Sequence, residues 1–277
     1  MTRSSRQKRS VKRRVSKESI MSSGSYAESQ TTSEYTADSM DKRVDSIQQH
    51  YNFIQHIWQS CFSAPVEEAL MRGSFVLDIG CGTGNWLKEM ANEYKCSEFV
   101  GVDILRHLTA EVNQLTNITF VQSNVLELLP FEENHFDYVR ISNMILCFPE
   151  NEWGNLLNEV ARILKPGGYV EIEEPDLEIS NRGPILDHMV SCCLEIYTQH
   201  GINSKLHTRL ELYLASTNQF TDVEWDHKIF SFSSFNDIPG LSLGEVSYYF
   251  VGDIAPRIAE YMGVTEKELI FMFDQIQ

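Results

Sequence analysis

Short apolar runs alternate with amphipathic stretches through the middle of this 277-residue chain. The apolar runs have the length and β-branched content of strands that are buried on both faces. They occupy residues 76–79, 99–102, 118–121, 136–141 and 169–172. Between them, residues 86–94, 104–115 and 151–165 fit helices, the last with a strongly amphipathic pattern. Strands that alternate with helices predict an α/β fold with a Rossmann-like, doubly wound and mostly parallel sheet.

The two ends of the chain are less regular than its middle. Residues 1–40 are rich in Ser, Thr, Arg and Lys and show no usable periodicity. We expect them to be disordered, because they cannot bury enough apolar surface to offset the entropy of ordering. Residues 41–277 are predicted to form one domain that opens with an amphipathic helix from Asp41 to about Cys61. The later elements are helices near 185–199 and 205–216, a strand from Thr221 to Phe232, and two final helices, the last opening with a capping box of Thr265 and Glu268.

Charge divides the chain into two parts. The first seventeen residues hold eight basic side chains and no acidic one, although the whole chain has a net charge of −16. The remaining residues hold fifteen basic and thirty-nine acidic side chains, a net charge of about −24. A body this acidic repels phosphates, so we expect no nucleic acid substrate. The sequence has no apolar run of about 18 residues that would predict a membrane span, and its six cysteines form no C-x-x-C pair, which favours a reduced protein without a metal site.

The basic N-terminal segment carries short signals with competing interpretations. The clusters at residues 8–9 and 12–14 resemble a nuclear localisation patch. An Arg-rich start without acids also fits a mitochondrial transit peptide, but only Val11 and Val15 would form its apolar face. We therefore expect a cytoplasmic or nuclear protein, and a plain solvated tail is the remaining interpretation. The run Arg13-Arg14-Val15-Ser16 has the form of a basophilic kinase site.

The most informative segment spans residues 76–84, which read Val-Leu-Asp-Ile-Gly-Cys-Gly-Thr-Gly. Glycines at the end of a buried strand let the backbone turn tightly and approach a ligand closely, because no Cβ is in the way. A dinucleotide fingerprint would need a further glycine where the chain has Asn85, and a P-loop would need a lysine that is absent. The alternate spacing of Gly80, Gly82 and Gly84 therefore indicates a nucleotide site of another kind.

Polar residues follow the next two predicted strands. Asp103 ends the second strand, 23 residues after Gly80. A carboxylate at that place can accept hydrogen bonds from both hydroxyls of a ribose, although an isolated strand-end acid would simply be solvated. Asn124 and Val125 follow the third strand, inside the segment 120–131.

These features resemble the class I S-adenosylmethionine-dependent methyltransferases. An acid followed by G-x-G-x-G is the family's first motif, and residues 120–131 resemble its G-D-A-x-x-L-P-F segment. Residues 164–168, Leu-Lys-Pro-Gly-Gly, match the turn before its fifth strand. The resemblance covers residues 74–175 as a cofactor-binding core and leaves 176–277 as substrate-side helices and sheet edge. It is strongest to the ubiquinone-biosynthesis-like methyltransferases, and residues 43–50 loosely resemble a run in fungal velvet-associated regulators.

The resemblance implies S-adenosyl-L-methionine as the cofactor. In the family an acid accepts the adenine amino group where this chain has Asn124, whose amide carbonyl can still accept, without charge assistance. The residues expected to bind the cofactor are Asp78, Gly80, Cys81, Gly82, Gly84, Asp103, Ile104, Asn124, Val125 and Ser142. The family's last strand lies between its fifth and sixth strands. This chain offers one candidate strand after the fifth, so we expect a sheet that lacks the last strand and an edge that needs another partner.

Methyl transfer from a sulfonium is an in-line displacement that chiefly needs proximity and a desolvated pocket, and it needs a base only for a protonated nucleophile. No catalytic residue is assigned by the sequence. Candidates at the ends of the fourth and fifth strands are Ser142, Asn143, Glu173, Glu174 and Asp176, and the predicted first helix offers Gln49, His50 and Tyr51 as lid residues. We expect an enzyme that methylates a small molecule or a protein. The alternatives are a cofactor-binding regulator with little activity, working with a protein partner, and an NAD oxidoreductase.

Overall fold

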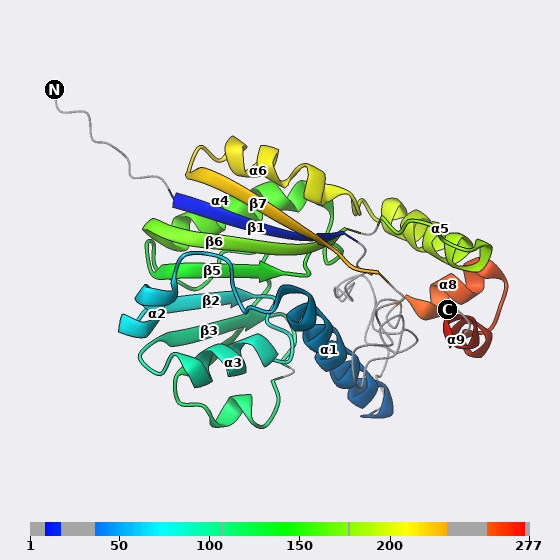
Figure 1. The fold of residues 1–277 in the computed structure, drawn as a ribbon, viewed down its shortest axis with the longest axis horizontal. Coiled ribbons are helices and arrows are strands. Elements are labelled where there is room, and N and C mark those ends of the chain that lie inside the picture. Colours follow the sequence, from blue (N-terminus) through cyan, green and yellow to red (C-terminus); the bar gives the residue numbers. More distant parts are fainter. Residues whose placement is uncertain (1–8, 18–36, 107, 177, 232–253, 275–277) are drawn as a thin grey trace.

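The computed structural model describes residues 9–17, 37–106, 108–176, 178–231 and 254–274. A single sheet runs through its centre, and every strand pairs in parallel with its neighbours (Figure 1). In spatial order the strands are β4 (Ile118–Gln122), β3 (Glu98–Asp103), β2 (Phe75–Ile79), β5 (Phe136–Ser142), β6 (Leu164–Asp176), β1 (Arg9–Lys17) and β7 (Phe220–Ile229). The predicted Rossmann-like, mostly parallel α/β fold is confirmed.

Helices cover both faces of the sheet, and a further group lies beyond the carboxyl ends of the strands (Figure 1). One face carries α1 (Ala37–Trp58), α2 (Glu67–Arg72) and α3 (Asn85–Glu93). The other carries α4 (Trp153–Ile163) and α6 (Leu210–Ser216). The group beyond the strand ends consists of α5 (Pro184–Gln199), α8 (Ala255–Met262) and α9 (Glu266–Asp274). None of the described helices is long and apolar enough to cross a bilayer.

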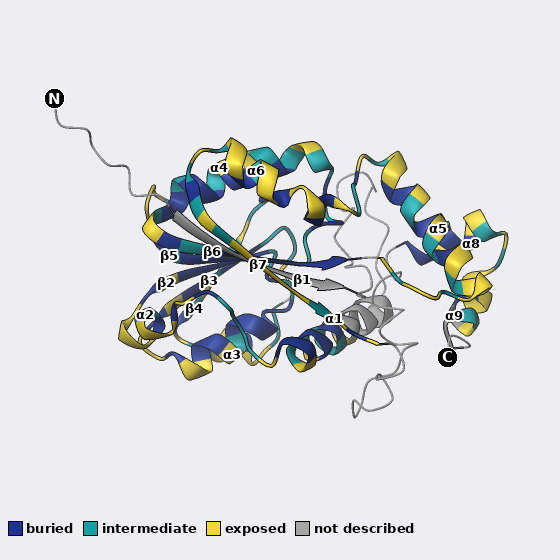
Figure 2. Cartoon of the chain, turned by 45° about the horizontal axis from the view of Figure 1, so that its top comes forward, coloured by how far each residue is buried: buried dark blue, intermediate teal, exposed yellow. Residues whose placement is uncertain are grey.

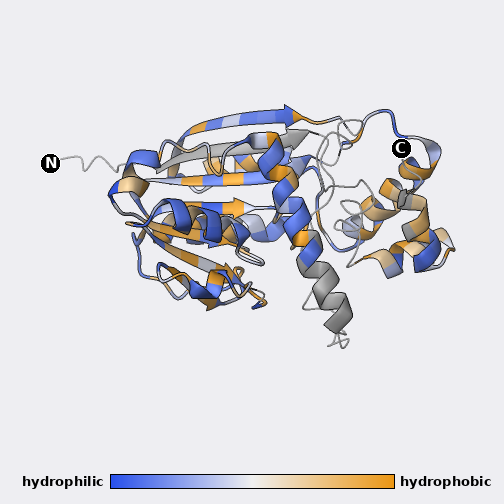
Figure 3. Cartoon of the chain, turned by 60° about the horizontal axis from the view of Figure 1, so that its bottom comes forward, coloured by the Kyte–Doolittle hydropathy of each residue, from blue (hydrophilic) through white to orange (hydrophobic). Residues whose placement is uncertain are grey.

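The central strands are buried on both faces, as their continuous apolar runs require. Successive side chains of a strand point to opposite faces. Val76 and Tyr138 accordingly belong to the apolar cluster under α3, whereas Leu77 and Val139 belong to the larger cluster under α4. Strands β2, β5 and β6 are mostly buried, while the outer faces of the helices are exposed and hydrophilic (Figures 2 and 3).

The N-terminal segment departs from the expectation of disorder over residues 1–40. Arg9–Lys17 forms β1, which lies between β6 and β7 and pairs with both. Residues 1–8 and 18–36 lie outside the described residues. The position of β1 is the one that the resemblance assigns to the family's last strand, although β1 comes from the opposite end of the chain and runs parallel to its neighbours. The expected need for another partner at β6 is thus met from the N-terminus.

Two local predictions were wrong, and one was confirmed. Residues 104–115 do not form an α-helix; among the described residues of this segment the helical turn is the short 3₁₀ segment Val112–Gln114. Strand β6 begins five residues earlier than predicted, before the Pro-Gly-Gly segment, which sits in a register shift opposite β5. The capping box at the start of α9 is present as expected.

Candidate functional site

The glycine turn between β2 and α3 has the backbone geometry that only glycine adopts easily. Gly80, Gly82 and Gly84 have φ values of 71°, 53° and 79°. The N–H groups of Gly80 and Cys81 both bond to the carbonyl of Val102 in β3, at 2.8 and 3.2 Å. These bonds hold the turn against β3. The outer surface of the turn lies at the carboxyl edge of the sheet.

Asp103 meets this turn at the end of β3. One carboxylate oxygen accepts from the N–H of Gly82 at 2.9 Å and the other from the N–H of Leu105 at 3.0 Å. Each carboxylate oxygen has two lone pairs, so both can still accept from a ligand hydroxyl. Ile104, the next residue, is half-buried and accepts through its carbonyl from the side-chain amide of Gln122.

The Asn124 loop is joined to the same edge. The backbone N–H of Ser123 donates to the carbonyl of Asp103 at 3.0 Å. Asn124 uses its side-chain carbonyl to accept from the N–H of Leu126 at 3.0 Å, and Val125 is buried beside it. The structure therefore brings the glycine turn, Asp103 and the Asn124 loop together.

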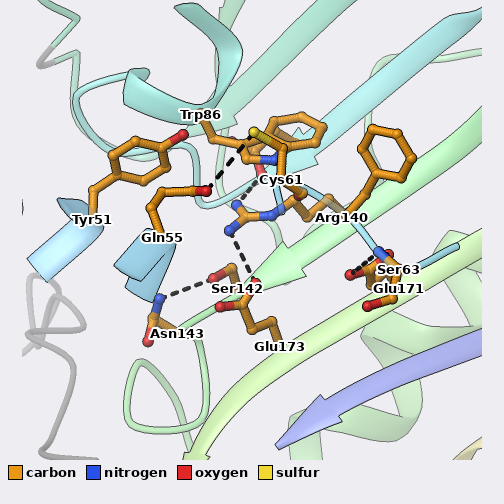
Figure 4. Close-up of polar contacts among 12 residues, drawn as sticks. Tyr51, Gln55, Cys61, Ser63, Trp86, Arg140, Ser142, Asn143, Glu171 and Glu173 are labelled. Atoms are coloured by element: carbon orange, nitrogen blue, oxygen red, sulfur yellow. Dashed lines mark hydrogen bonds and ion pairs between the residues drawn. The ribbon is translucent and has the colours of Figure 1, made fainter. Parts of the chain in front are cut away.

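Ser142 and Asp78 occupy different surroundings from that cluster. Ser142 ends β5 and accepts through its hydroxyl oxygen from the side-chain amide of Asn143 at 2.9 Å (Figure 4). Asp78 lies inside β2, almost fully buried, and its carboxylate contacts Arg140 at 3.1 Å. Cys81 points into the apolar cluster under α3, where burial raises the pKa of its thiol well above the ordinary value.

A buried ion cluster centred on Arg140 was missed by sequence reasoning. Arg140 lies in β5 with one guanidinium nitrogen 3.1 Å from Asp78 and another 3.5 Å from Glu173 of β6, and the group stacks over the Trp86 ring at 4.9 Å (Figure 4). Burial lowers the pKa of Arg140, but the two carboxylates outweigh it and raise that pKa above its usual value. Burial also raises the pKa of Asp78 to about 6, against the opposing effect of Arg140. The available signal was an arginine within the apolar run of the fourth predicted strand.

Helix α1 lies over the glycine turn, as the predicted lid would. A Cβ placed on Gly82 would meet Ile47 of α1 at 3.9 Å and no nearer atom. His50 of the same helix lies 3.0 Å from the side-chain oxygen of Asn143, which joins α1 to the end of β5. Tyr51 donates to Glu89 of α3, so α1 is bonded on both sides of the turn.

His50 is buried and uncharged. Burial lowers the pKa of its imidazole to about 4, although the hydrogen bond to Asn143 raises it in part. Because the side-chain amide of Asn143 donates to Ser142, its oxygen faces His50, and Nε2 of His50 is the donor. Nδ1 is therefore the unprotonated nitrogen.

The acidic candidates at the end of β6 have structural contacts. Glu174 accepts from the N–H groups of Met144 and Ile145, each at 2.9 Å, and so fixes the loop after β5. Glu173 contacts Arg140 as described above. Asp176 lies 3.6 Å from His207 and accepts from the N–H of Glu178 at 3.0 Å.

An open polar groove of about 500 Å³ separates α1 from α3. Its lining consists of Gln48, Tyr51, Asn85, Lys88, Glu89, Asn92 and Glu93. None of the residues expected to bind the cofactor lines it, so we do not place the cofactor there. Within the described part of the chain, no three His, Cys, Asp or Glu residues are grouped to hold a metal ion.

Comparison with known proteins agrees with this geometry. Residues 76–168 match the methyltransferase domain family. The demethylmenaquinone methyltransferase of Staphylococcus carnosus is 26% identical over 233 residues, which are 81% of this chain and 89% of that protein. The chain therefore carries a class I S-adenosylmethionine-dependent methyltransferase domain. The Bacillus licheniformis protein of the same name is 33% identical to this methyltransferase over 114 residues, 38% of the chain and 48% of that protein.

A solved structure with the cofactor gives a similar but weaker match to the methyltransferase. Phosphoethanolamine N-methyltransferase 2 of Haemonchus contortus, in complex with S-adenosyl-L-methionine, is 20% identical. The match covers 67% of this chain and 42% of that one, with a TM-score of 0.47.

S-adenosylmethionine is the cofactor of this methyltransferase, and the residues present fit it. Gly82 offers bare backbone beneath α1, where a Cβ would meet only Ile47. Asp103 offers a carboxylate with spare acceptor capacity at the same turn. A ribose needs hydrogen-bond acceptors, and the methionine part needs a close approach to backbone.

Gly82→Ala is expected to weaken binding of S-adenosylmethionine beyond its effect on folding. The new methyl group would occupy the space under α1 that the ligand needs, and its φ of 53° would cost about 1–2 kcal/mol of stability. Gly167→Ala is the matched control, because Gly167 also has a positive φ, 82°, and open space around it. Calorimetry and thermal unfolding should show similar destabilisation in both variants and lost affinity only in Gly82→Ala. Equal affinities would contradict the placement of the ligand.

Proposed function

We propose that this methyltransferase transfers the methyl group to a nucleophile of a small molecule or a protein that binds between α1 and the carboxyl ends of β5 and β6. The supporting observation is the position of His50 and Asn143. They bond to each other at 3.0 Å and so join the lid helix to the end of β5, and Ile47 of the same helix lies over Gly82 of the glycine turn. The turn and this pair are thus two sides of one site.

On the cofactor side, we assign the ribose hydroxyls to Asp103 and the adenine edge to Asn124 and the N–H of Val125. When bound, S-adenosylmethionine supplies a methyl group on a positively charged sulfur, which is already activated for displacement. The chain itself needs to hold the donor, align the acceptor and exclude water. Helix α1 contributes to the last of these, since it covers the turn.

On the acceptor side, we assign the positioning role to His50. Glu173 and Glu174 already serve the Arg140 cluster and the loop after β5. A neutral imidazole has one donor and one acceptor nitrogen, so it can bond a hydroxyl or amine without carrying a charge. Such a bond would orient the nucleophile without the cost of burying a charge.

The first acceptor to test is a demethylated quinol. The relatives from Staphylococcus carnosus and Bacillus licheniformis are named for demethylmenaquinone. The strongly acidic body supports an uncharged or cationic acceptor and disfavours a nucleic acid.

The test is formation of S-adenosylhomocysteine by the purified full chain. We expect turnover with a demethylated naphthoquinol or with a fractionated cell extract, and none with S-adenosylmethionine alone. Asp103→Ala is the control that should remove the signal. Tight cofactor binding without turnover in any fraction would overturn the proposal.

His50→Ala is expected to lower kcat about tenfold to hundredfold, because the nucleophile loses its orienting partner. The affinity for S-adenosylmethionine should not change. His56→Ala is the matched control, since His56 is an exposed histidine of the same helix. Because the pKa of His50 is about 4, the wild-type rate should show no step from His50 between pH 6 and 9 and should fall below about pH 5 as the imidazole protonates. A step near pH 6.5 that disappears in His50→Ala would contradict this assignment.

A further inference from the structure

The side chain of Met144 covers the first glycine of the turn between β2 and α3. A Cβ placed on Gly80 would overlap the Sδ atom of Met144 and lie 3.1 Å from its Cε atom. At Gly82 the nearest atom to such a Cβ belongs to Ile47, 3.9 Å away. The turn is therefore closed over Gly80 by Met144 and open over Gly82.

The loop after β5 holds Met144 in this position. The backbone N–H groups of Met144 and Ile145 each donate at 2.9 Å to the carboxylate of Glu174, which is buried in β6. Hydrogen bonds to a carboxylate are stronger than those between neutral groups. At the other end of the side chain, Sδ of Met144 lies 3.5 Å from Sγ of Cys147 in the same loop. Both the backbone and the thioether of Met144 thus have partners that fix their place.

The same loop joins the two halves of the proposed site. Asn143, the residue before Met144, bonds to His50 of the lid helix at 3.0 Å. Consecutive residues therefore contact the two sides: Asn143 reaches the histidine of the acceptor side, and Met144 reaches Gly80 of the cofactor turn. The methyl group has to pass from one side to the other, and Met144 lies at the boundary between them.

A thioether suits this boundary chemically. A methionine side chain is unbranched, uncharged and polarisable, so it packs closely against irregular surfaces and makes dispersion contacts there. Its sulfur is only a weak hydrogen-bond acceptor, so it does not hold water beside a methyl donor. Met144 is half-buried, which leaves part of the side chain open to a ligand. Transfer from a sulfonium needs such a desolvated and aligned pocket.

We propose that Met144 forms the wall of the methyl-donor subsite: its thioether packs against the sulfur and the methyl group of bound S-adenosylmethionine and excludes water from them. The contact with the cofactor follows from the position of Met144 over the turn and needs no particular acceptor. The effect on transfer rests on the proposed function, because it requires a nucleophile that approaches from the His50 side. The contact and the effect are tested separately.

Oxidation of methionine by hydrogen peroxide tests the contact. The purified full chain is treated with dilute peroxide, with and without saturating S-adenosylmethionine, and peptide mapping by mass spectrometry follows each methionine sulfoxide. We expect the cofactor to slow oxidation of Met144 at least about fivefold, because it covers the accessible thioether. Met71 of α2, which is 60% exposed, is the control and should be oxidised at the same rate in both samples. An unprotected Met144 in a chain that calorimetry shows to be saturated would overturn the contact.

Met144→Gln and Met144→Leu test the exclusion of water. Glutamine is unbranched like methionine but carries an amide that binds water, whereas leucine keeps the side chain apolar. We expect the kcat of Met144→Gln to fall about tenfold at an unchanged KM for the acceptor, and that of Met144→Leu to stay within about threefold of the wild type. A loss of stability alone would leave the kcat of the folded protein unchanged. Met71→Gln is the matched control and should have the wild-type kcat and KM.

The outcomes separate this inference from the proposed function. A Met144→Gln protein with the wild-type kcat would overturn the role of Met144 in transfer. If no form of the chain, the wild type included, produced S-adenosylhomocysteine with any acceptor, the proposed function would fail instead. Protection of Met144 from peroxide by the cofactor would still decide whether the thioether lies in the donor subsite.

Discussion

Replacing Arg140 by methionine is expected to lower the free energy of unfolding by about 3–5 kcal/mol at pH 7.5. The substitution keeps an unbranched side chain in the strand but removes the cation between Asp78 and Glu173, both of which are nearly inaccessible to water. Two buried carboxylates would then remain without their charged partner. Denaturant unfolding followed by circular dichroism measures the loss.

The effect of the Arg140→Met substitution should depend on pH in a definite direction. Asp78 has a folded-state pKa of about 6, above the ordinary value of 3.8, so the folded chain takes up a proton before the unfolded chain does. Stability from this group therefore rises as the pH falls from about 7 towards 4. Without Arg140 the pKa of Asp78 rises further, and the deficit of the variant should be smaller at pH 5 than at pH 7.5.

Arg72→Ala provides the control for the loss of an ion pair. Arg72 contacts Glu68 at 3.4 Å, but both side chains are exposed. Its loss should change stability by no more than about 0.5 kcal/mol and show no comparable pH dependence. If Arg140→Met lowered the free energy of unfolding no more than Arg72→Ala does, the Arg140 cluster would not stabilise the fold.

Asp103→Ala is expected to weaken binding of S-adenosylmethionine at least tenfold, about 1.4 kcal/mol. The variant removes the proposed acceptor for the ribose hydroxyls. It also frees the N–H groups of Gly82 and Leu105, which loosens the turn that the ligand contacts. Asp103→Asn retains one carbonyl acceptor and should fall between the wild type and Asp103→Ala. Isothermal calorimetry measures the three affinities.

Glu127→Gln is the charge-matched control for the Asp103 variants. Glu127 is an exposed acid in the Asn124 loop, so its neutralisation changes local charge without removing the proposed contact. The affinity of the Glu127→Gln variant for S-adenosylmethionine should equal that of the wild type. An Asp103→Ala protein that binds normally would refute the ribose assignment, and its melting temperature without ligand would show whether folding alone was affected.

The strands of the core could be predicted because burial on both faces requires a continuous run of apolar residues in the sequence. A strand such as β3 has an apolar run over residues 99–102, and its end is marked by the change to Asp103. The last helix was equally readable, because Thr265 and Glu268 satisfy each other's backbone N–H groups within one turn. Such signals are local in the chain.

Strand β1 and the Arg140 cluster could not be predicted, because their partners are distant in sequence. Residues 9–17 alternate apolar and basic positions weakly, and only β6 and β7 make a strand of them. Arg140 is explained only when Asp78 and Glu173 are placed on the strands to either side. The acidic residues that lie beside Arg140 cannot be identified until the order of the strands in the sheet is known.

Within the candidate site, the sequence located the turn and Asp103 but not the contacts that organise them. The structure adds that Asp103 braces the turn through Gly82, that Glu174 fixes the loop after β5, and that His50 reaches Asn143. Each of these contacts joins a loop to a helix or strand that is distant in sequence, so it depends on the fold as a whole.

The place of β1 also has a consequence for the order in which the molecule is built. Arg9 pairs with Phe220, so β1 meets one of its partners during synthesis only after about 210 further residues have been made. Pairings over such distances carry a large loop-closure cost and form late. The sheet should thus assemble from β2 to β6 first and be completed by the later insertion of β1 beside β6 and β7.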